Sequence, residues 1–532
     1  MAVSDTGFGD CMQKLCIDSV DGVSDAVRRA LKAFDAEHSP VFCDVRLDVD
    51  EGKGAYALNG NIKSAAEDVD CSLGVRVYAA AGGVVATGQA GETLGRENFW
   101  DAGKHGERLL GLALKRARRN AEQKAKAVKA FPSMGKSFWS TLLASVKEET
   151  AVIKPAFEGN PRDTALEELV ARTEKCSTAL RKMDGVAANE TTMVTGLERQ
   201  LYLNNLGADI DQGKAFTQSF AFVTAKGKAV ETFYEWSGAL AGTEVFEGKN
   251  PRGMLYEAFA GQLAEGTIAL SNAPAVKSTD KPVTVITDPN FNALFVHEII
   301  GHPCEADRAL KKEAAWAGRA WWFRGLNDNE IGKPVASEHV NVFSDPGLEG
   351  YGRYDFDDEG VRGKRVQHIK DGELKGFLNS RETAAVLGDE PNGGMRASSA
   401  AQVPLIRMNN TCFDNGPYSK EELFEETREG FYVVGQKTPS IGETRQNFQI
   451  TCWKLFEIRD GEIGTLYRMG GITGDSPTFL KSIEAAADDL QVYNIPVCGK
   501  GTPMQTMRVG NGGPHLKAKA RVTGGSVQGG QQ

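Results

Sequence analysis

Long apolar segments, an excess of basic residues and a disulfide framework are all missing from this sequence, and each absence excludes a class of protein. No stretch of the 532 residues reaches the roughly 18 uncharged apolar residues that a membrane-spanning helix needs. The start, MAVSDTGFGDCMQKL, has no basic region followed by an apolar run, so we expect no signal peptide. The formal net charge of −9 disfavours a general affinity for nucleic acid, and we expect neither nucleic acid nor a membrane as a partner.

The nine cysteines have neither the even number nor the regular spacing of a disulfide framework. Such a pattern is typical of a protein in a reducing compartment, with thiols that are mostly buried. We therefore expect a cytoplasmic protein.

What the sequence does contain is an ordinary globular composition in a chain long enough for more than one domain. It is 41% hydrophobic and 25% charged, and its 60 glycines indicate many tight turns. From Pro282 onward strand and turn signals dominate. We expect an α+β protein, with an N-terminal mixed α/β domain followed by a β-rich, largely antiparallel C-terminal domain. The expected divisions are 1–275, with candidate subdomains 1–150 and 151–275, then 276–525, and a flexible tail at 526–532.

Several local patterns predict individual elements of these domains. GVRVYAAAGGVVATG (74–88) is typical of two strands joined at a Gly-Gly pair, and Asp-Gly pairs predict hairpins at 368–378 and 457–467. KPVTVITD (281–288) predicts a buried strand whose final aspartate caps the next helix. Residues 107–130 have the spacing of a long amphipathic helix that carries a basic stripe. A basic stripe suits an acidic partner or nucleic acid, but we favour the solvated face of a surface helix.

The segment FVHEIIGHPCEADR, which begins at Phe295, contains residue types that bind and use metal ions. His297 and His302 are two of only 7 histidines in the chain, and Glu298 lies between them. The zinc-peptidase pattern His-Glu-x-x-His has its histidines four apart on one helix face, whereas these two are five apart. On an ideal α-helix such residues are rotated by about 140°, so their imidazoles would not meet at one ion.

Two helix-breaking residues beside the motif suggest how the histidines converge. Gly301 permits unusual dihedrals, and Pro303 disfavours the α conformation of His302. We therefore expect a π-type widening or a broken last turn that swings His302 toward His297.

A catalytic zinc site typically has three protein ligands and an open position, and the local sequence does not identify the third ligand. The candidates, near and distant, are Cys304, Glu305, Asp307, Cys452, Cys498, His339, His368 and His515. Cys498 has the best setting, in PVCGKGTP, because the flanking glycines form a loop that approaches an ion closely and Lys500 favours a thiolate. The competing interpretation of Cys498 is a buried or loop-borne cysteine without a ligand role.

Beyond these residues the sequence resembles the TldD/PmbA family, zinc peptidases whose active subunits carry the pattern His-Glu-x-x-x-His (HExxxH). HEIIGHPCEAD fits the family's His-Glu-x-x-Gly-His-x-x-Glu-x-Asp pattern. FDDEGVRGKRVQHIKDGELKGFL (356–378) is similar to its Asp-Asp-Glu-Gly segment and the hairpin after it, and PLIRMNNTC (404–412) resembles its Arg-Met-x-Asn segment. The resemblance covers roughly 280–525 well and the N-terminal half more loosely.

The resemblance implies a site and an activity. It carries over His297, His302 and Cys498 as zinc ligands and Glu298 as the catalytic carboxylate, which places this chain with the active subunit type. A zinc-dependent metallopeptidase that hydrolyses peptide bonds in unfolded or extended peptides is then expected, with zinc-bound water activated by Glu298. The family also implies a dimer that encloses a cavity, either a homodimer or a heterodimer with a related subunit.

Other interpretations stay open at this point. Glu305 and Asp307 either orient an imidazole or are a helix cap and surface charge, and Arg407 either meets a substrate carboxylate or, as we favour, braces the core. The activity is alternatively that of a zinc amidohydrolase on a small or modified peptide. A third interpretation is a non-catalytic regulator or scaffold, although a purely structural zinc usually has four protein ligands and little need for Glu298.

Overall fold

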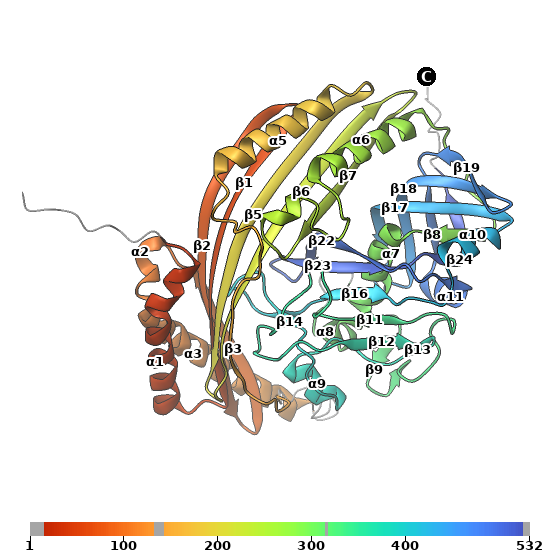
Figure 1. Ribbon diagram of the computed structural model, residues 1–532. Coiled ribbons are helices and arrows are strands. Elements are labelled where there is room, and N and C mark those ends of the chain that lie inside the picture. The colour runs from red at the N-terminus through yellow and green to blue at the C-terminus, as the bar shows by residue number, and fades with distance from the viewer. Residues whose placement is uncertain (1–14, 132–142, 314–317, 525–532) are drawn as a thin grey trace, which may run out of the picture.

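The computed structural model describes residues 15–131, 143–313 and 318–524, and its mixture of helices and strands confirms the α+β class (Figure 1). The predicted tail at 526–532 lies outside these residues. Within them, no helix is long and apolar enough to cross a membrane.

The first half of the chain forms one long, curved sheet of seven strands (Figure 1). The strand order is β3-β2-β1-β5-β6-β4, with β7 also paired to β6, and only the β4–β6 pairing is parallel. The strands are β1 (Phe42–Leu58), β2 (Asn61–Ala81), β3 (Val84–Thr93), β4 (Thr150–Ile153), β5 (Val186–Asn204), β6 (Asp209–Lys226) and β7 (Val230–Ala239). The helices of this half are α1 (Val20–His38), α2 (Arg96–Phe99), α3 (Ala102–Ala130), α5 (Leu166–Arg181) and α6 (Tyr256–Asn272), with 3-10 turns at Ile17–Ser19 and Thr243–Phe246.

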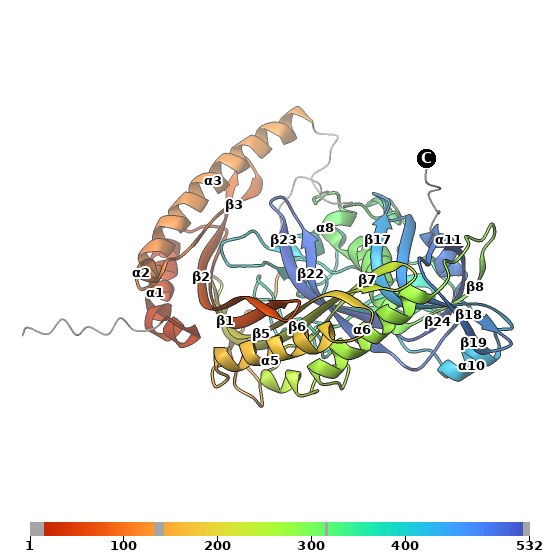
Figure 2. The ribbon, with the colours of Figure 1, turned by 90° about the horizontal axis from the view of Figure 1, so that it is seen from above.

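Alternating side chains give this sheet two different faces. In β1, Leu47 and Val49 pack in a core shared with α1 and α3, and Ala55 packs in a core shared with α5 and α6. Successive side chains of a strand point to opposite faces, so Asp48 and Asp50 point away from these helices. Figure 2 shows α5 and α6 on one side of the sheet and the C-terminal half on the other. The even-numbered, polar positions of this part of β1 therefore face the C-terminal half.

The second half contains two larger sheets, of orders β13-β12-β11-β16-β23-β22 and β17-β8-β24-β20-β18-β19, with β21 paired to β24. The strands are β8 (Val283–Thr287), β9 (Phe323–Gly325), β10 (Asp328–Asn329), β11 (Val342–Ser344), β12 (Val366–Lys370), β13 (Glu373–Leu374), β14 (Met395–Arg396), β15 (Leu405–Ile406), β16 (Asn410–Phe413), β17 (Glu429–Ile441), β18 (Asn447–Arg459), β19 (Glu462–Tyr467), β20 (Gly471–Asp475), β21 (Ala485–Ala486), β22 (Gln491–Lys500), β23 (Gln505–Gly513) and β24 (Leu516–Thr523). The helices are α7 (Pro289–Val296), α8 (Ala306–Ala309), α9 (Arg381–Leu387), α10 (Lys420–Glu425) and α11 (Ser476–Lys481). Helix α7 contacts β17 of one sheet and β16, β22 and β23 of the other, so the segment that follows it lies deep in the C-terminal half.

The elements predicted from local patterns are confirmed. The Gly-Gly pair joins β2 to β3, and the two Asp-Gly pairs join β12 to β13 and β18 to β19. Both aspartates and both glycines of the Asp-Gly pairs have positive φ, as a tight hairpin requires. The amphipathic helix is α3, and its basic residue Arg116 donates to the carbonyl of Gln89. Part of the basic stripe therefore contacts the neighbouring strand.

Candidate metal centre

The segment that carries the histidine motif is anchored at the end of a buried strand. Asp288 caps α7 as predicted, because its carboxylate accepts a hydrogen bond of 2.7 Å from the amide of Phe291. The same carboxylate accepts a second bond of 3.0 Å from the amide of Gly435 on β17. All eight residues of α7 are buried. This position fixes where the motif begins, inside the core of the C-terminal half.

The helix widens at the motif itself, as the five-residue spacing predicted. Residues His297–Gly301 form a π-helical turn, followed by a 3-10 turn over His302–Cys304. The amide of His302 donates to the carbonyl of His297, which is the hydrogen bond between residues five apart that defines a π-turn. Adding one residue to the turn places His302 over His297.

The glycine and the proline act differently from the expectation. Gly301 has ordinary helical dihedrals (φ −57°, ψ −57°), and so does His302, although Pro303 follows it. A Cβ atom on Gly301 would lie 2.0 Å from the sulfur of Met408. Glycine is therefore needed for the close approach of Met408, and the turn of the chain comes from the π-bond.

Three donor groups meet at this point. The ligand atoms of His297, His302 and Cys498 all lie within 4.8 Å of one another, and the three residues are buried. The two imidazole centroids are 4.7 Å apart with their planes at 85°, and the Sγ atom of Cys498 lies 3.8 Å from Nε2 of His302. Cys498 reaches the histidines because β22 and β23 pack against α7.

Each imidazole is oriented through its other nitrogen. Nδ1 of His297 lies 3.0 Å from the side-chain oxygen of Asn511, and Nδ1 of His302 lies 3.1 Å from the carboxylate of Glu305. An oxygen acceptor at Nδ1 assigns the ring proton to that nitrogen and leaves Nε2 free to bind a metal. Two such imidazoles and a thiolate form a donor set that suits zinc. The residues present therefore fit the metal that the sequence implies.

A buried charge network holds Glu305 in place. Its carboxylate also accepts bonds of 2.8 Å from Arg308 Nε and 3.1 Å from Lys500 Nζ. Burial opposes ionisation, but Lys500, His302 and Arg308 together hold the pKa of Glu305 well below its usual range. Asp307 belongs to the same network, 2.7 Å from Lys500 Nζ. Glu305 therefore contacts an imidazole, which was one of the two interpretations offered for both carboxylates, whereas Asp307 contacts Lys500.

Lys500 and Arg407 have structural roles around the cysteine. The Lys500 ammonium is bonded to Glu305, Asp307 and the carbonyl of Ile406, so it does not face the thiol as the sequence suggested. Arg407 is fully buried and donates to the carbonyl of Cys498, which agrees with the bracing role that we favoured. Burial raises the pKa of Cys498, but the two histidines and Arg407 outweigh it and hold this pKa well below its usual range.

Glu298 pairs with an arginine that the sequence analysis did not single out. Arg445 Nη1 donates to the Glu298 carboxylate and, at 3.0 Å, to its main-chain carbonyl. Arg445 lies in the turn between β17 and β18, and its own carbonyl accepts a 2.9 Å bond from Ser476 Oγ. Burial raises the pKa of Glu298, but Arg445 and both histidines lower it to about 2. No local pattern identifies Arg445 or Asn511, since each reaches the site through strand pairing.

The other candidate ligands lie elsewhere. His368 bonds to Ser344 Oγ (2.7 Å) and to the carbonyl of Gly376 (3.0 Å), and His515 pairs with Asp489 (2.6 Å). Cys304, Cys452 and His339 also lie outside the group formed by the two motif histidines and Cys498. In the part of the chain that the structure describes, no second group of three or more His, Cys, Asp or Glu residues is arranged to hold a metal ion.

Comparison with known proteins identifies the family. A family model described as the PmbA/TldA metallopeptidase C-terminal domain matches residues 279–524. A metalloprotease of Methanothermobacter thermautotrophicus is 30% identical over 345 residues, which cover 65% of this chain and 71% of that protein. A zinc metalloprotease TldD homolog of Saccharolobus solfataricus is 36% identical over 247 residues, 46% of this chain and 52% of that protein.

The fold also agrees with solved structures. TldE from Thermococcus kodakarensis matches with a TM-score of 0.68 at 18% identity, over 94% of this chain and 100% of that chain. Identity this low supports the fold alone, whereas the metalloprotease relatives support the activity. The chain belongs to the TldD/PmbA family and is a metallopeptidase.

Proposed function

We propose that the protein is a zinc-dependent peptidase that hydrolyses peptide bonds in unfolded or extended peptides. His297, His302 and Cys498 are its zinc ligands and Glu298 its catalytic carboxylate. The single observation that carries the proposal is the meeting of the three donor groups within 4.8 Å, with the Nδ1 atom of each imidazole bonded to an oxygen acceptor. Three ligands rather than four also favour a catalytic over a structural site.

The chain's own residues supply binding, orientation and proton transfer. When bound, zinc supplies Lewis acidity, which polarises a peptide carbonyl and makes water more acidic. Glu298 accepts the proton of the attacking water and delivers it to the nitrogen of the departing amine. Arg445 keeps the Glu298 carboxylate ionised and fixes it through the bond to the main-chain carbonyl of the same residue.

An edge strand beside the site suits extended substrates. β22 carries Cys498 and is the last strand of its sheet in the described parts of the chain, where its outer side has no strand partner in that sheet. Val497, next to the cysteine, is 61% exposed. An extended peptide that adds to such an edge gains main-chain hydrogen bonds with little sequence preference.

The proposal includes the organisation of the protein. The strands of the first sheet all come from residues 42–239 and those of the other sheets from 283–523, which supports a domain boundary near 275. Since 1–150 and 151–275 both contribute strands to the first sheet, we propose that they form one domain. A homodimer, or a heterodimer with a TldE-like subunit, is the proposed assembly. The eight cysteines that the structure describes are unpaired, which supports a reducing, cytoplasmic location.

The test measures metal content and peptide cleavage together. Wild type is expected to hold one zinc per chain, Cys498→Ala to lose most of it, and Cys452→Ala, which changes another buried cysteine, to keep it. Glu298→Gln is expected to keep zinc and to lose cleavage of an unstructured peptide by about 10²- to 10⁴-fold in kcat. Zinc retained in Cys498→Ala would contradict the ligand set, and cleavage of small amides only would favour the amidohydrolase alternative. Zinc without hydrolysis of either substrate would favour a regulatory role.

A further inference from the structure

One edge of the first sheet is left without a strand partner over part of its length. β2 pairs with β1 along residues 61–78, but β3 covers the other side of β2 only at residues 72–81. In the described parts of the chain, no strand lies beside residues 61–71 on that side. The side chains of residues 63–68 are all exposed. Residues 61–71 of β2 are called the free edge below.

Hydrogen bonds near the free edge show which main-chain groups point outward. The carbonyl of Tyr78 accepts from the amide of Val41 on the side of β1, whereas the carbonyl of Cys71 accepts a 2.8 Å bond from the amide of Leu94 on the outer side. The N–H and C=O groups of one residue point to the same side of a strand, and successive residues alternate. The odd-numbered residues from 65 to 71 therefore point their main-chain groups away from β1.

Only part of this outward row is available for pairing. The amide of Val69 is bonded to the neighbouring Asp68 carboxylate at 2.8 Å. At the other end, the register shifts so that Lys63 has no partner on β1, and such a β-bulge interrupts regular pairing. Between these limits, no described residue bonds to the outward main-chain groups of Ala65 and Glu67.

A second copy of the same edge fits these groups when it runs antiparallel across a two-fold axis at Ala66. Ala65 of each copy then faces Glu67 of the other, and the N–H and C=O groups of both residues are all paired. Ala66 meets Ala66 of the second copy at a position without main-chain hydrogen bonds, where antiparallel strands approach most closely. Two methyl groups fit such a close approach.

The side chains beside the axis are complementary in the same register. Ser64 comes opposite Asp68 of the second copy and points to the same face of the sheet. The Ser64 hydroxyl has no hydrogen-bond partner among the described residues. It would donate to the Asp68 carboxylate, and the two-fold axis repeats this bond on the other side.

The neighbouring registers fit less well. An axis at Glu67 would place the two Glu67 carboxylates opposite each other, and like charges across strands destabilise a sheet. An axis at Ala65 would place Lys63 opposite Glu67, where the charges suit each other but the bulge removes Lys63 from the regular ladder. The edge is therefore complementary to itself in one register, which favours a second copy over an unrelated peptide.

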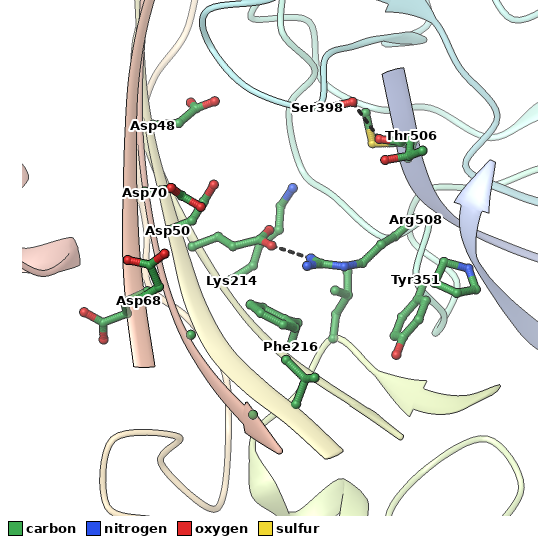
Figure 3. Close-up of a pocket in the computed structure, with 18 of the residues that line it drawn as sticks. Asp48, Asp50, Asp68, Asp70, Lys214, Phe216, Tyr351, Ser398, Thr506 and Arg508 are labelled. Carbon is green, nitrogen blue, oxygen red and sulfur yellow. Dashed lines mark hydrogen bonds and ion pairs between the residues drawn. The ribbon is translucent and has the colours of Figure 1, made fainter. Parts of the chain in front are cut away.

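The free edge also borders a cavity of about 670 Å³ beside the candidate metal centre (Figure 3). Four residues of β2 line this cavity, namely Ser64, Ala66, Asp68 and Asp70. Figure 3 shows Asp68 and Asp70 on one wall and Arg508 across from them. The cavity is also lined by Met507, which is the cross-strand partner of Cys498. Since the axis is perpendicular to the sheet, the second copy would continue this wall on the same face.

We propose that the free edge is the surface on which a second copy of this chain docks, as an antiparallel continuation of the first sheet with the two-fold axis at Ala66. The proposal rests on the homodimer proposed above, to which it assigns a surface and a strand register. Each cavity is then bordered by residues of both copies.

The test places one cysteine on the axis and another beside it, in the full-length protein. The Cα atoms of a non-hydrogen-bonded antiparallel pair are about 4.5 Å apart, which a disulfide spans. In this register the Cα atoms of the two Ala65 residues are about 9 Å apart, which is too far. Under mild oxidation, Ala66→Cys is expected to run mostly as a linked dimer on a non-reducing gel, and Ala65→Cys and wild type as monomers. Equal cross-linking of the two variants would overturn the proposal.

Sedimentation at several protein concentrations measures the dimer itself. Ser64→Ala is expected to raise the Kd of the dimer by about tenfold, because a hydrogen bond is lost on both sides of the axis. Ser440→Ala, which changes an exposed serine on β17, is expected to keep the wild-type Kd. A stable dimer without the Ala66→Cys cross-link would overturn this interface and leave the homodimer standing. A monomer at every concentration would overturn both, while zinc content and peptide cleavage decide the peptidase function separately.

Discussion

At the scale of single residues, the candidate metal centre depends on groups that do not touch the metal position. Asn511 and Glu305 accept from the Nδ1 atoms of the two imidazoles and so determine which nitrogen faces Cys498. The Asn511 side chain is neutral, and among the described residues it bonds otherwise only to the carbonyl of Thr411. A substitution of Asn511 therefore tests the orientation of the His297 ring without changing the buried charges that surround Glu305.

Replacing Asn511 with leucine is expected to weaken zinc binding by about 10- to 100-fold. The substitution keeps the volume of the side chain but removes the acceptor that orients His297, and partners of this kind contribute affinity of that size. Zinc affinity is measured by competition with a chromogenic chelator. Asn409→Leu, which changes another buried asparagine without a histidine contact, is the matched control. Equal affinity in both variants and wild type would contradict the orienting role.

A histidine outside the candidate metal centre gives a prediction on how stability depends on pH. His368 is fully buried, and desolvation lowers its pKa to about 4 although the carbonyl of Gly376 opposes this. A depressed pKa in the folded state means that stability is complete above about pH 6.5, the unfolded value, and is lost as the pH falls toward 4.

Wild type is therefore expected to lose about 3 kcal/mol more free energy of unfolding between pH 7 and pH 4 than His368→Gln, which cannot titrate there. Urea unfolding at both pH values, with a chelator present throughout, measures the difference. His339→Gln, which changes a partly exposed histidine, is expected to keep the wild-type pH dependence. Parallel pH dependence in wild type and His368→Gln would show that His368 is not buried in its neutral form.

At the scale of elements, the π-turn is what converts a five-residue spacing into a shared site. Its position is fixed from both sides, by the Asp288 cap at the start of α7 and by the close packing of Gly301 on Met408 at the end. Glycine is required at position 301 because there is no room for a Cβ atom. The dihedrals of Gly301 are available to any residue.

Gly301→Ala is expected to destabilise the protein by about 1–3 kcal/mol, because its Cβ would overlap the buried Met408 sulfur. It is also expected to lower zinc content, since the π-turn sets the position of His302 relative to His297. Chemical unfolding and elemental analysis measure the two effects, and Met408→Ala in the same chain is expected to restore part of both. Gly111→Ala in α3, where a new methyl group meets no atom within 4 Å, is expected to be neutral or to stabilise by ~0.5–1 kcal/mol. Equal effects of the two glycine substitutions would contradict the packing argument.

At the scale of the whole molecule, the site joins segments that are far apart in the chain. The two histidines lie directly after α7, which follows β8, and Cys498 lies on a strand almost at the other end of the C-terminal half. A metal that binds all three therefore stabilises the folded arrangement and not the unfolded chain, so binding adds directly to stability.

Removing zinc is expected to lower the midpoint of thermal unfolding. The loss corresponds to about 2.7 kcal/mol if free zinc had been present at a hundred times its Kd. Scanning calorimetry before and after dialysis against a chelator measures the shift, and zinc added back is expected to reverse it. Cys498→Ala is expected to unfold at the same temperature with and without the chelator. An equal shift in wild type and Cys498→Ala would mean that the stabilising metal lies elsewhere.

The sequence by itself determined the local geometry: the α+β class, the hairpins at Asp-Gly and Gly-Gly pairs, the cap at Asp288 and the widened turn after it. These features follow from residues within a few positions of each other, whose dihedrals and hydrogen bonds they set directly. From the residues alone Cys498 remained one candidate among several, and Arg445 and Asn511 gave no signal. Only the tertiary structure brings these side chains to the candidate metal centre, and only the strand register sets Asp50 of β1 opposite Asp70 of β2. Pairing between distant strands depends on the packing of the whole chain, which no short segment encodes.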